Sequence, residues 1–169
     1  MSTWFYKVTQ DLTELPGCIT WYETQLEEAR KEIKLKGNLE THSRELPGIF
    51  EFRFNQLQEI EAILEHLNID LRKLRSEKFK KFIEHYNRSL TSRDAEKYVD
   101  GDADVVSLSK LINEFSLLRN KYLGLIKALD TKQWQVTNIR NLTILDTKQW
   151  QVTNIVKLRV AGMDDASLG

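Results

Sequence analysis

Hydrophobic residues recur along this chain at alternating steps of three and four, the spacing that places side chains on one face of an α-helix. The pattern is most regular in two stretches, residues 57–74 and residues 108–129. The positions are Leu57, Ile60, Leu64, Leu67, Leu71 and Leu74 in the first stretch, and Leu108, Leu111, Phe115, Leu118, Tyr122, Leu125 and Leu129 in the second. Both are seams typical of coiled coils and helical bundles. We therefore predict an all-α protein built from long amphipathic helices.

A shorter helical stripe precedes these two seams. It consists of Ile19, Tyr22, Leu26, Ala29 and Ile33. The spacing of Thr20 and Glu23 is that of a capping box, so we expect this helix to begin at Thr20. We expect it to end at Leu46-Pro47-Gly48, because a proline and a glycine interrupt a helix. Residues 1–17 contain an apolar cluster near the start and are expected to dock on the remainder of the chain.

The length of the second helix bears on assembly. If this helix runs unbroken from Ile49 to Tyr86, it is roughly 57 Å long. A rod of that length is hard to bury in a chain of 169 residues, which favours a homo-oligomer. The alternative is an antiparallel bundle within one chain, in which the seams pack on one another.

A tandem repeat occupies the C-terminal part of the chain. The sequence LDTKQWQVTNI begins at Leu129 and returns unchanged at Leu145, which indicates a recent or engineered duplication of a 16-residue unit. In one continuous helix the two copies would be turned about 160° apart, so one tryptophan would leave the core. We therefore predict that a helix restarts at each copy, with N-caps at Asp130 and Asp146 and a turn near residues 143–146. Short strands are the alternative, because β-branched residues are frequent in the repeat.

These elements divide the chain into five segments. They are 1–48 (N-terminal lead-in and first amphipathic helix), 49–93 (long heptad helix with a basic C-terminal half), 94–104 (acidic connector), 105–129 (second heptad helix) and 129–169 (tandem repeat and tail). Cys18 is the one cysteine, which fits a reducing compartment. The chain lacks a secretory signal pattern and a run of about 18 apolar residues. We expect a cytoplasmic protein without a membrane span.

The sequence carries no pattern typical of an enzyme. The three histidines lie on separate segments, and a single cysteine excludes a structural zinc site. The acidic run 100–104 begins like a calcium loop, but Val105 and Leu111 stand where glycine and glutamate are required. These acids instead suit the start of a helix, where negative charge is favourable. We expect no enzymatic activity, no metal and no cofactor.

One segment is a candidate binding site. Residues 72–93 hold eight Lys and Arg against two Glu, a local charge of +6, and the connector 94–104 that follows has a charge of −4. Cations can follow a phosphate backbone, and exposed aromatic rings can stack on unpaired bases. The alternative is a solvated helix face in which Phe79, Phe82 and Tyr86 continue the core stripe. Both interpretations hold together if the aromatic rings face inwards and the cations outwards.

The order of features along residues 70–160 carries a family resemblance. The basic segment with Tyr86 is followed by AEKYVDGDADV (95–105), by RNKYLGLIK (119–127) and by KQWQVTNI (132–139). This order resembles the UvsY-type recombination mediators of tailed phages. In that family a basic stretch with tyrosine precedes an acidic D-x-D break, a Y-L-x-x-x-I-K helix and a final aromatic-Q-x-x-N-I element. The chain departs from the family in lacking a glycine close behind Tyr86 and in doubling the last element.

The resemblance implies a function. A protein of this family binds single-stranded DNA as a homo-oligomeric ring and helps a RecA-like recombinase replace a single-strand-binding protein. The DNA-binding residues that it implies here are Arg72, Lys73, Arg75, Lys78, Lys80, Lys81, Tyr86 and Arg88. The setting would be the host cytoplasm if the protein is phage-encoded. The alternative is a non-enzymatic structural or adaptor protein, such as a virion or scaffold component without a DNA role, which the net charge of zero favours.

Overall fold

The computed structural model describes residues 3–33, 39–85 and 91–166, and every secondary-structure element in these ranges is a helix. The elements are α1 Thr3–Gln10, the 3-10 helix η1 Leu12–Glu14, α2 Leu15–Glu32, α3 Leu39–His85, α4 Ser92–Asp100 and α5 Ala103–Ala166. The prediction of an all-α fold with long helices is confirmed. Within the same ranges, no helix contains a stretch apolar enough to span a lipid bilayer.

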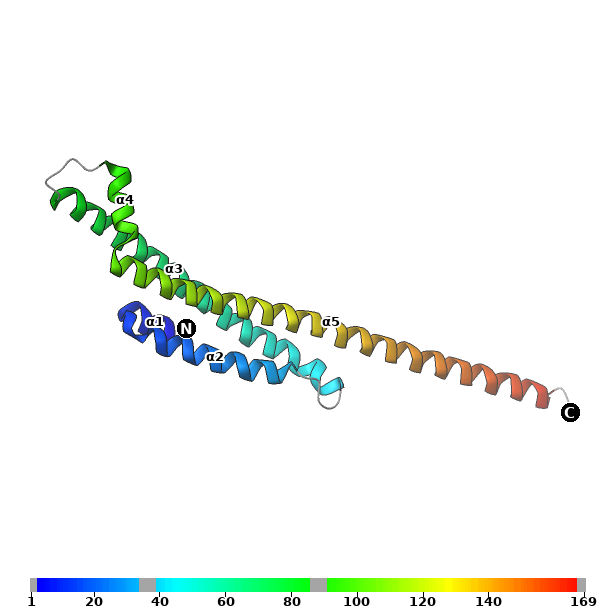
Figure 1. The fold of residues 1–169 in the computed structure, drawn as a ribbon. Coiled ribbons are helices and arrows are strands. Elements are labelled where there is room, and N and C mark those ends of the chain that lie inside the picture. The colour runs from blue at the N-terminus through cyan, green and yellow to red at the C-terminus, as the bar shows by residue number, and fades with distance from the viewer. Residues whose placement is uncertain (1–2, 34–38, 86–90, 167–169) are drawn as a thin grey trace.

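Three long helices form the body of the molecule. α3 and α5 lie side by side and run in opposite directions, with α4 at the turn between them, and α2 packs along the pair (Figure 1). α1 folds back at the start of α2 and also contacts α3. α5 then continues beyond the ends of α2 and α3 and has no neighbouring helix over its last part (Figure 1).

The two predicted seams form the core of this body. Leu57, Ile60, Leu64 and Leu67 on α3 are buried, and on α5 every seam position except the half-buried Leu111 is buried. The seams therefore pack within one chain, which is the antiparallel bundle that the sequence left as an alternative. The length of α3 does not by itself require a partner chain, because α5 is the longer helix and runs along α3.

The expected bounds of the first helix are wrong at both ends. α2 begins at Leu15, where Pro16 suits a first turn that needs no backbone N–H. Thr20 makes no cap, and its hydroxyl donates to the carbonyl oxygen of Pro16 at 2.9 Å. Pro47 lies inside α3 instead of ending a helix. Burial of the adjacent Leu46 helps to offset the backbone hydrogen bond that this proline removes.

Most of the segment expected to be an acidic connector is the helix α4. The hydroxyl oxygen of Thr91 accepts a hydrogen bond from the backbone N–H of Asp94 at 3.3 Å and so caps this helix. Ala95 and Val99 are buried. After α4 only Gly101 and Asp102 precede α5. The expectation that acids begin the last helix is confirmed, since a carboxylate oxygen of Asp102 accepts from the backbone N–H of Asp104 at 3.0 Å.

The tandem repeat lies within α5, which is a single helix from Ala103 to Ala166. The predicted restart at each copy is therefore wrong, and so is the alternative of strands. Thr131 and Thr147 donate their hydroxyls to carbonyl oxygens four residues earlier, at 2.9 and 2.8 Å, as threonine does inside a helix. The expectation of one core tryptophan is also wrong. In the first copy Lys132 and Val136 are buried while Trp134 is exposed, and the core does not reach Trp150 in the second copy.

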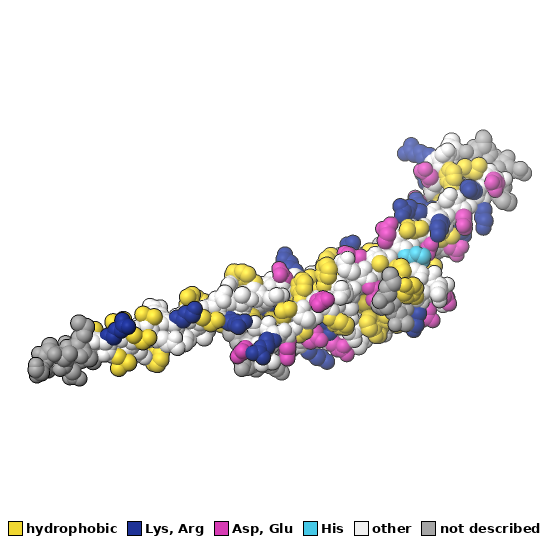
Figure 2. Space-filling view, turned by 180° about the vertical axis from the view of Figure 1, so that it is seen from behind, with side chains coloured by type: hydrophobic (Ala, Val, Ile, Leu, Met, Phe, Trp, Pro, Cys, Tyr) yellow, Lys and Arg dark blue, Asp and Glu magenta, His cyan; other side chains and the backbone are white. Residues whose placement is uncertain are grey.

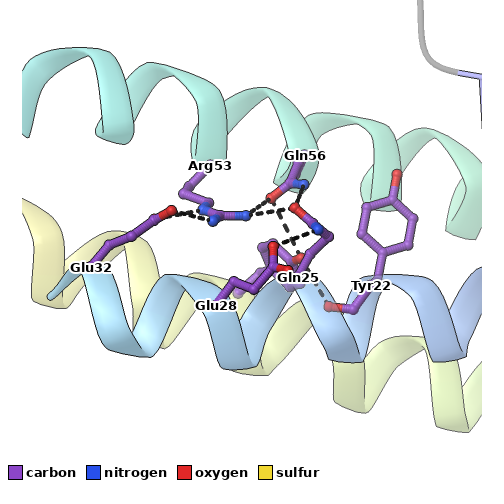
Figure 3. Close-up of polar contacts among 7 residues, drawn as sticks. Tyr22, Gln25, Glu28, Glu32, Arg53 and Gln56 are labelled. Carbon is purple, nitrogen blue, oxygen red and sulfur yellow. Dashed lines mark hydrogen bonds and ion pairs between the residues drawn. The ribbon is translucent and has the colours of Figure 1, made fainter.

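A buried polar cluster joins α2 to α3 (Figure 3). The side chain of Arg53 is buried and donates to both carboxylate oxygens of Glu32, at 2.7 and 3.1 Å. It also donates to the amide oxygens of Gln25 and Gln56, each at 3.0 Å. A carboxylate and two amides thus compensate the buried guanidinium. Helical periodicity marks Arg53 only as one polar residue among many.

A second polar cluster ties the N-terminal helix to the body. The Tyr122 hydroxyl donates to the carbonyl oxygen of Tyr22 at 3.0 Å, and the Tyr22 hydroxyl donates to Glu59. The other carboxylate oxygen of Glu59 accepts from the backbone N–H of Phe5 at 3.0 Å. Val8 is buried as well. The expectation that the apolar N-terminal residues dock on the remainder of the chain is confirmed.

Candidate nucleic-acid interface

The predicted basic segment occupies the C-terminal part of α3, beside α4 and the start of α5. Arg72, Lys73, Arg75, Lys78, Lys80 and Lys81 are described in the structure, whereas Tyr86 and Arg88 lie outside the described residues. At about 100° per residue, the six described cations do not share one face of the helix. They form an outward group and an inward group.

The outward group contains Lys73 and Lys80, which are seven residues apart and so lie on the same face about two turns from each other. Arg72 and Lys81 flank this face on either side, and all four side chains are exposed. We refer to Arg72, Lys73, Lys80 and Lys81 as the outer basic face.

Arg72 and Lys73 of the outer basic face form ion pairs with acids of their own helix. Arg72 contacts Glu65 at 3.3 Å and Lys73 contacts Asp70 at 3.5 Å. Both cations are largely solvent-exposed, and exposed pairs of this kind contribute little to stability. Lys80 makes no ion pair with any residue that the structure describes. The outer basic face is therefore accessible to an anion from solvent.

The inward group, Arg75 and Lys78, points towards the acids at the α4–α5 turn. Arg75 contacts Asp100 at 2.7 Å. Lys78 contacts Asp102 at 2.9 Å and Asp104 at 2.5 Å, and its side chain is only 19% exposed. The hydrogen bonds to Asp104 and Asp102 raise the pKa of Lys78, and the hydrogen bond from Lys78 lowers the pKa of Asp102. Both residues are charged at neutral pH, and their charges are compensated within the protein.

Phe79 and Phe82, the two aromatic residues of the basic segment that the structure describes, face α4. Phe79 is half-buried and lines a hollow of about 310 Å³ together with residues of α4. The ring of Phe82 lies 5.8 Å from the ring of Tyr98, measured between centroids. This is the inward placement of aromatic rings that the sequence left open for this segment. Tyr98 itself is 48% exposed, beside the basic segment.

Tyr98 lies in the stretch 95–105 that carries the family resemblance, but it is not among the DNA-binding residues that the resemblance implies. The spacing of apolar residues in α4 could have identified it. Ala95 and Val99, four residues apart, form the buried side of this helix, and Tyr98 lies at the edge of that side. An exposed ring can stack on an unpaired base. Tyr98 therefore extends the candidate interface from α3 onto α4.

Charges of both signs are mixed at this end of the molecule. In Figure 2 the Lys and Arg side chains over the end of α3 and over α4 lie among Asp and Glu side chains. No group of three or more His, Cys, Asp or Glu among the described residues is placed to hold a metal ion. The arrangement suits reversible contact with a flexible anion better than it suits a deep binding pocket.

Comparisons with known proteins bear on the fold. No protein-family model matches this sequence, and no curated protein matches it. Among solved structures, the chain is similar to the crystal structure of the recombination mediator protein UvsY of bacteriophage T4, with a TM-score of 0.62 and 11% sequence identity. The similarity covers 74% of this chain and 98% of the UvsY chain. The chain therefore has a UvsY-like helical fold.

Proposed function

We propose that this protein is a recombination mediator that binds single-stranded DNA and helps a RecA-like recombinase replace a single-strand-binding protein. The observation that carries the proposal is the outer basic face on a fold shared with a phage recombination mediator. Four exposed cations along one side of α3 can follow the phosphates of a flexible strand. Tyr98 beside them offers a ring for stacking on a base. We expect this activity in the cytoplasm.

The other four predicted DNA contacts fall into two pairs. Tyr86 and Arg88 follow α3 directly in the sequence and remain proposed DNA contacts. Arg75 and Lys78 are proposed contacts that must first separate from their acids. The mediator role also needs contact with the recombinase and with the single-strand-binding protein.

Assembly into a homo-oligomer is part of the proposal, and the uncovered part of α5 supports it. Residues 137–160, which we call the arm, contain no buried side chain. At 1.5 Å per residue the arm is about 36 Å long. Its exposed large hydrophobic residues are Ile139, Leu142, Ile144, Leu145, Trp150, Val152, Ile155, Val156, Leu158 and Val160. Figure 2 shows hydrophobic side chains along this arm with Lys and Arg between them.

Two physical arguments indicate that the arm is covered in solution. Soluble monomers rarely expose apolar patches larger than several hundred Å². A lone helix rich in valine, isoleucine and threonine is also marginal in water, because these residues have low helix propensity and helix nucleation is costly. Packing of arms from several chains would supply the missing contacts. It would also bring several outer basic faces together, which strengthens binding to one strand.

The first test measures DNA binding by anisotropy of a labelled oligothymidylate at several salt concentrations. If three to six cations contact phosphates, log affinity should fall with log salt at a slope of roughly −2 to −4. The double variant Lys80→Glu, Lys81→Glu should lose most binding while circular dichroism shows unchanged helicity. The control Lys31→Glu, Lys127→Glu changes the charge equally at exposed positions elsewhere and should retain binding.

The second test addresses the mediator role. A RecA-like recombinase should hydrolyse ATP faster on DNA coated with single-strand-binding protein when this protein is added, and the Lys80→Glu, Lys81→Glu variant should not have this effect. DNA binding without any stimulation would contradict the mediator role. An absence of DNA binding at low salt would favour the structural or adaptor alternative. The net charge of zero and the apolar arm are consistent with that alternative.

A further inference from the structure

The cations of the inward group are covered by acids that follow them in the chain. α4 turns the chain back, so that residues 100–104 lie against α3 at Arg75 and Lys78. Three carboxylates there contact two cations, at distances of 2.5 to 2.9 Å. Carboxylates at this spacing occupy the positions that phosphate oxygens would take in a complex with a strand.

The turn is held in this position by contacts of its own. Ala95 and Val99 bury one side of α4, and the hollow lined by Phe79 and Val99 lies where α4 meets α3. Asp102 caps α5 through the backbone N–H of Asp104 while it also contacts Lys78, and its side chain is only 16% exposed. Asp104 contacts the same ammonium with a side chain that is 68% exposed. One carboxylate is therefore fixed by the fold, and the other is open to exchange.

We infer that the acidic turn 100–104 is an autoinhibitory element that competes with DNA phosphates for Arg75 and Lys78. This inference rests on the proposed DNA-binding function. A strand would first contact the outer basic face, where Lys80 has no acidic partner among the described residues. Phosphates of the same strand would then displace Asp100 and Asp104. The carboxylates of Asp100 and Asp104 are exposed to solvent, so their exchange for phosphates is reversible and sets the affinity instead of blocking binding.

The test uses Asp100→Asn, Asp102→Asn, Asp104→Asn, which removes three charges and keeps side chains of the same shape. Asparagine is as good an N-cap as aspartate, so α5 keeps its cap. The dissociation constant for labelled oligothymidylate should fall by roughly threefold to thirtyfold at low salt. Two newly available cations should also steepen the salt slope by about 1.4. The control Glu51→Gln, Glu114→Gln, Asp130→Asn makes the same change of charge at exposed positions outside the arm and should have a smaller effect.

A second comparison depends on the pairing itself and does not require the triple variant to fold. Asp104→Asn alone alters an exposed side chain, and Lys78→Gln removes the cation that it contacts. Lys78→Gln should weaken DNA binding more in the Asp104→Asn background than in the wild type, because Asp104 already occupies Lys78 in the wild type. Equal effects in both backgrounds would contradict the inference.

The outcomes separate this inference from the proposed function. Tighter binding in the acidic-turn variant and not in its control would support the inference. Equal tightening in both would show a general effect of net charge and overturn it. Unchanged affinity in the acidic-turn variant, with binding lost in Lys80→Glu, Lys81→Glu, would overturn the inference and leave the DNA-binding function in place. If the wild type and all variants fail to bind DNA, both the inference and the proposed DNA-binding function are wrong.

Discussion

Trp134 and Trp150 hold equivalent places in an identical repeat, yet they lie on nearly opposite sides of one uninterrupted helix and are 68% and 67% exposed. Sixteen residues at about 100° each leave the two rings about 160° apart. The far part of α5 therefore presents the same side chains in two directions, and its own body covers neither ring. A helix of this kind can contact a neighbouring chain on each side, as in a ring or a filament.

We predict that Trp134→Ala and Trp150→Ala each weaken assembly and leave the body intact. Neither ring belongs to the core, so the thermal midpoint at low concentration should change little. Truncation of a buried interface tryptophan typically costs about 2 kcal/mol or more of association energy. Sedimentation velocity at micromolar concentration measures the shift to smaller species, with Gln151→Ala as the control. A wild type that sediments as a monomer would contradict both this prediction and the proposed homo-oligomer.

Deletion of residues 129–144 should leave a folded body. The second copy then follows Ala128 directly, and its first eleven residues, through Ile155, repeat those removed. The buried residues Leu129, Lys132 and Val136 are thereby replaced by identical residues in the same register. The arm becomes about 24 Å shorter. Urea denaturation followed by circular dichroism should give an unchanged midpoint for the body, and we expect the shortened protein still to assemble. Unfolding on deletion would show that the duplication is integral to the fold.

Removal of the buried arginine should be among the most destabilising polar substitutions in the body. Arg53→Ala leaves Glu32 and two glutamine amides without their shared donor, at a cost of about 3–5 kcal/mol. Glu32→Gln should cost less, because Glu32 is partly exposed. The control Arg44→Ala breaks an exposed pair with Glu40 and should cost under about 1 kcal/mol. Denaturant titration of the three variants gives the ranking, and equal losses for Arg53→Ala and Arg44→Ala would refute it.

Cys18 should report on opening of the body. Burial raises the pKa of its thiol from 9.0 to about 12, with a smaller contribution from the negative charge of Glu59. At pH 8 the folded thiol is neutral and buried, so iodoacetamide should react with it only after unfolding. Above pH 9 the unfolded chain loses this proton first, and stability should fall by up to about 1.4 kcal/mol per pH unit until about pH 12.

The matched variant for this pH dependence is Cys18→Ala. It should lose the part of the alkaline slope that the thiol contributes. It should retain the part from Tyr22, whose pKa burial also raises. An identical slope in the two proteins between pH 9 and pH 11 would contradict the assignment. Rapid alkylation of the folded wild type at pH 8 would show that the thiol is accessible.

The sequence by itself determined the helical architecture and the residues of its core. Seams such as Leu57 to Leu67 could be identified because helical burial repeats with a local period, which neighbouring residues reveal without knowledge of the fold. The basic segment could be identified for the same reason, because its net charge is counted over neighbouring residues. It also explains why Asp102 was correctly expected at the start of a helix, since a cap acts within one turn.

Only the tertiary structure decided where the helices end and which charges are compensated. Asp130 and Asp146 could each cap a new helix, but no proline or glycine near them interrupts the chain. The helix therefore continues and keeps its backbone hydrogen bonds. Pro47 lies inside a helix whose adjacent Leu46 is buried against other parts of the chain. The pairing of Lys78 with Asp102 and Asp104 depends on how α4 turns the chain back onto α3. Such contacts join residues that are distant in sequence. Their distances depend on how whole helices pack, which a local sequence pattern cannot predict.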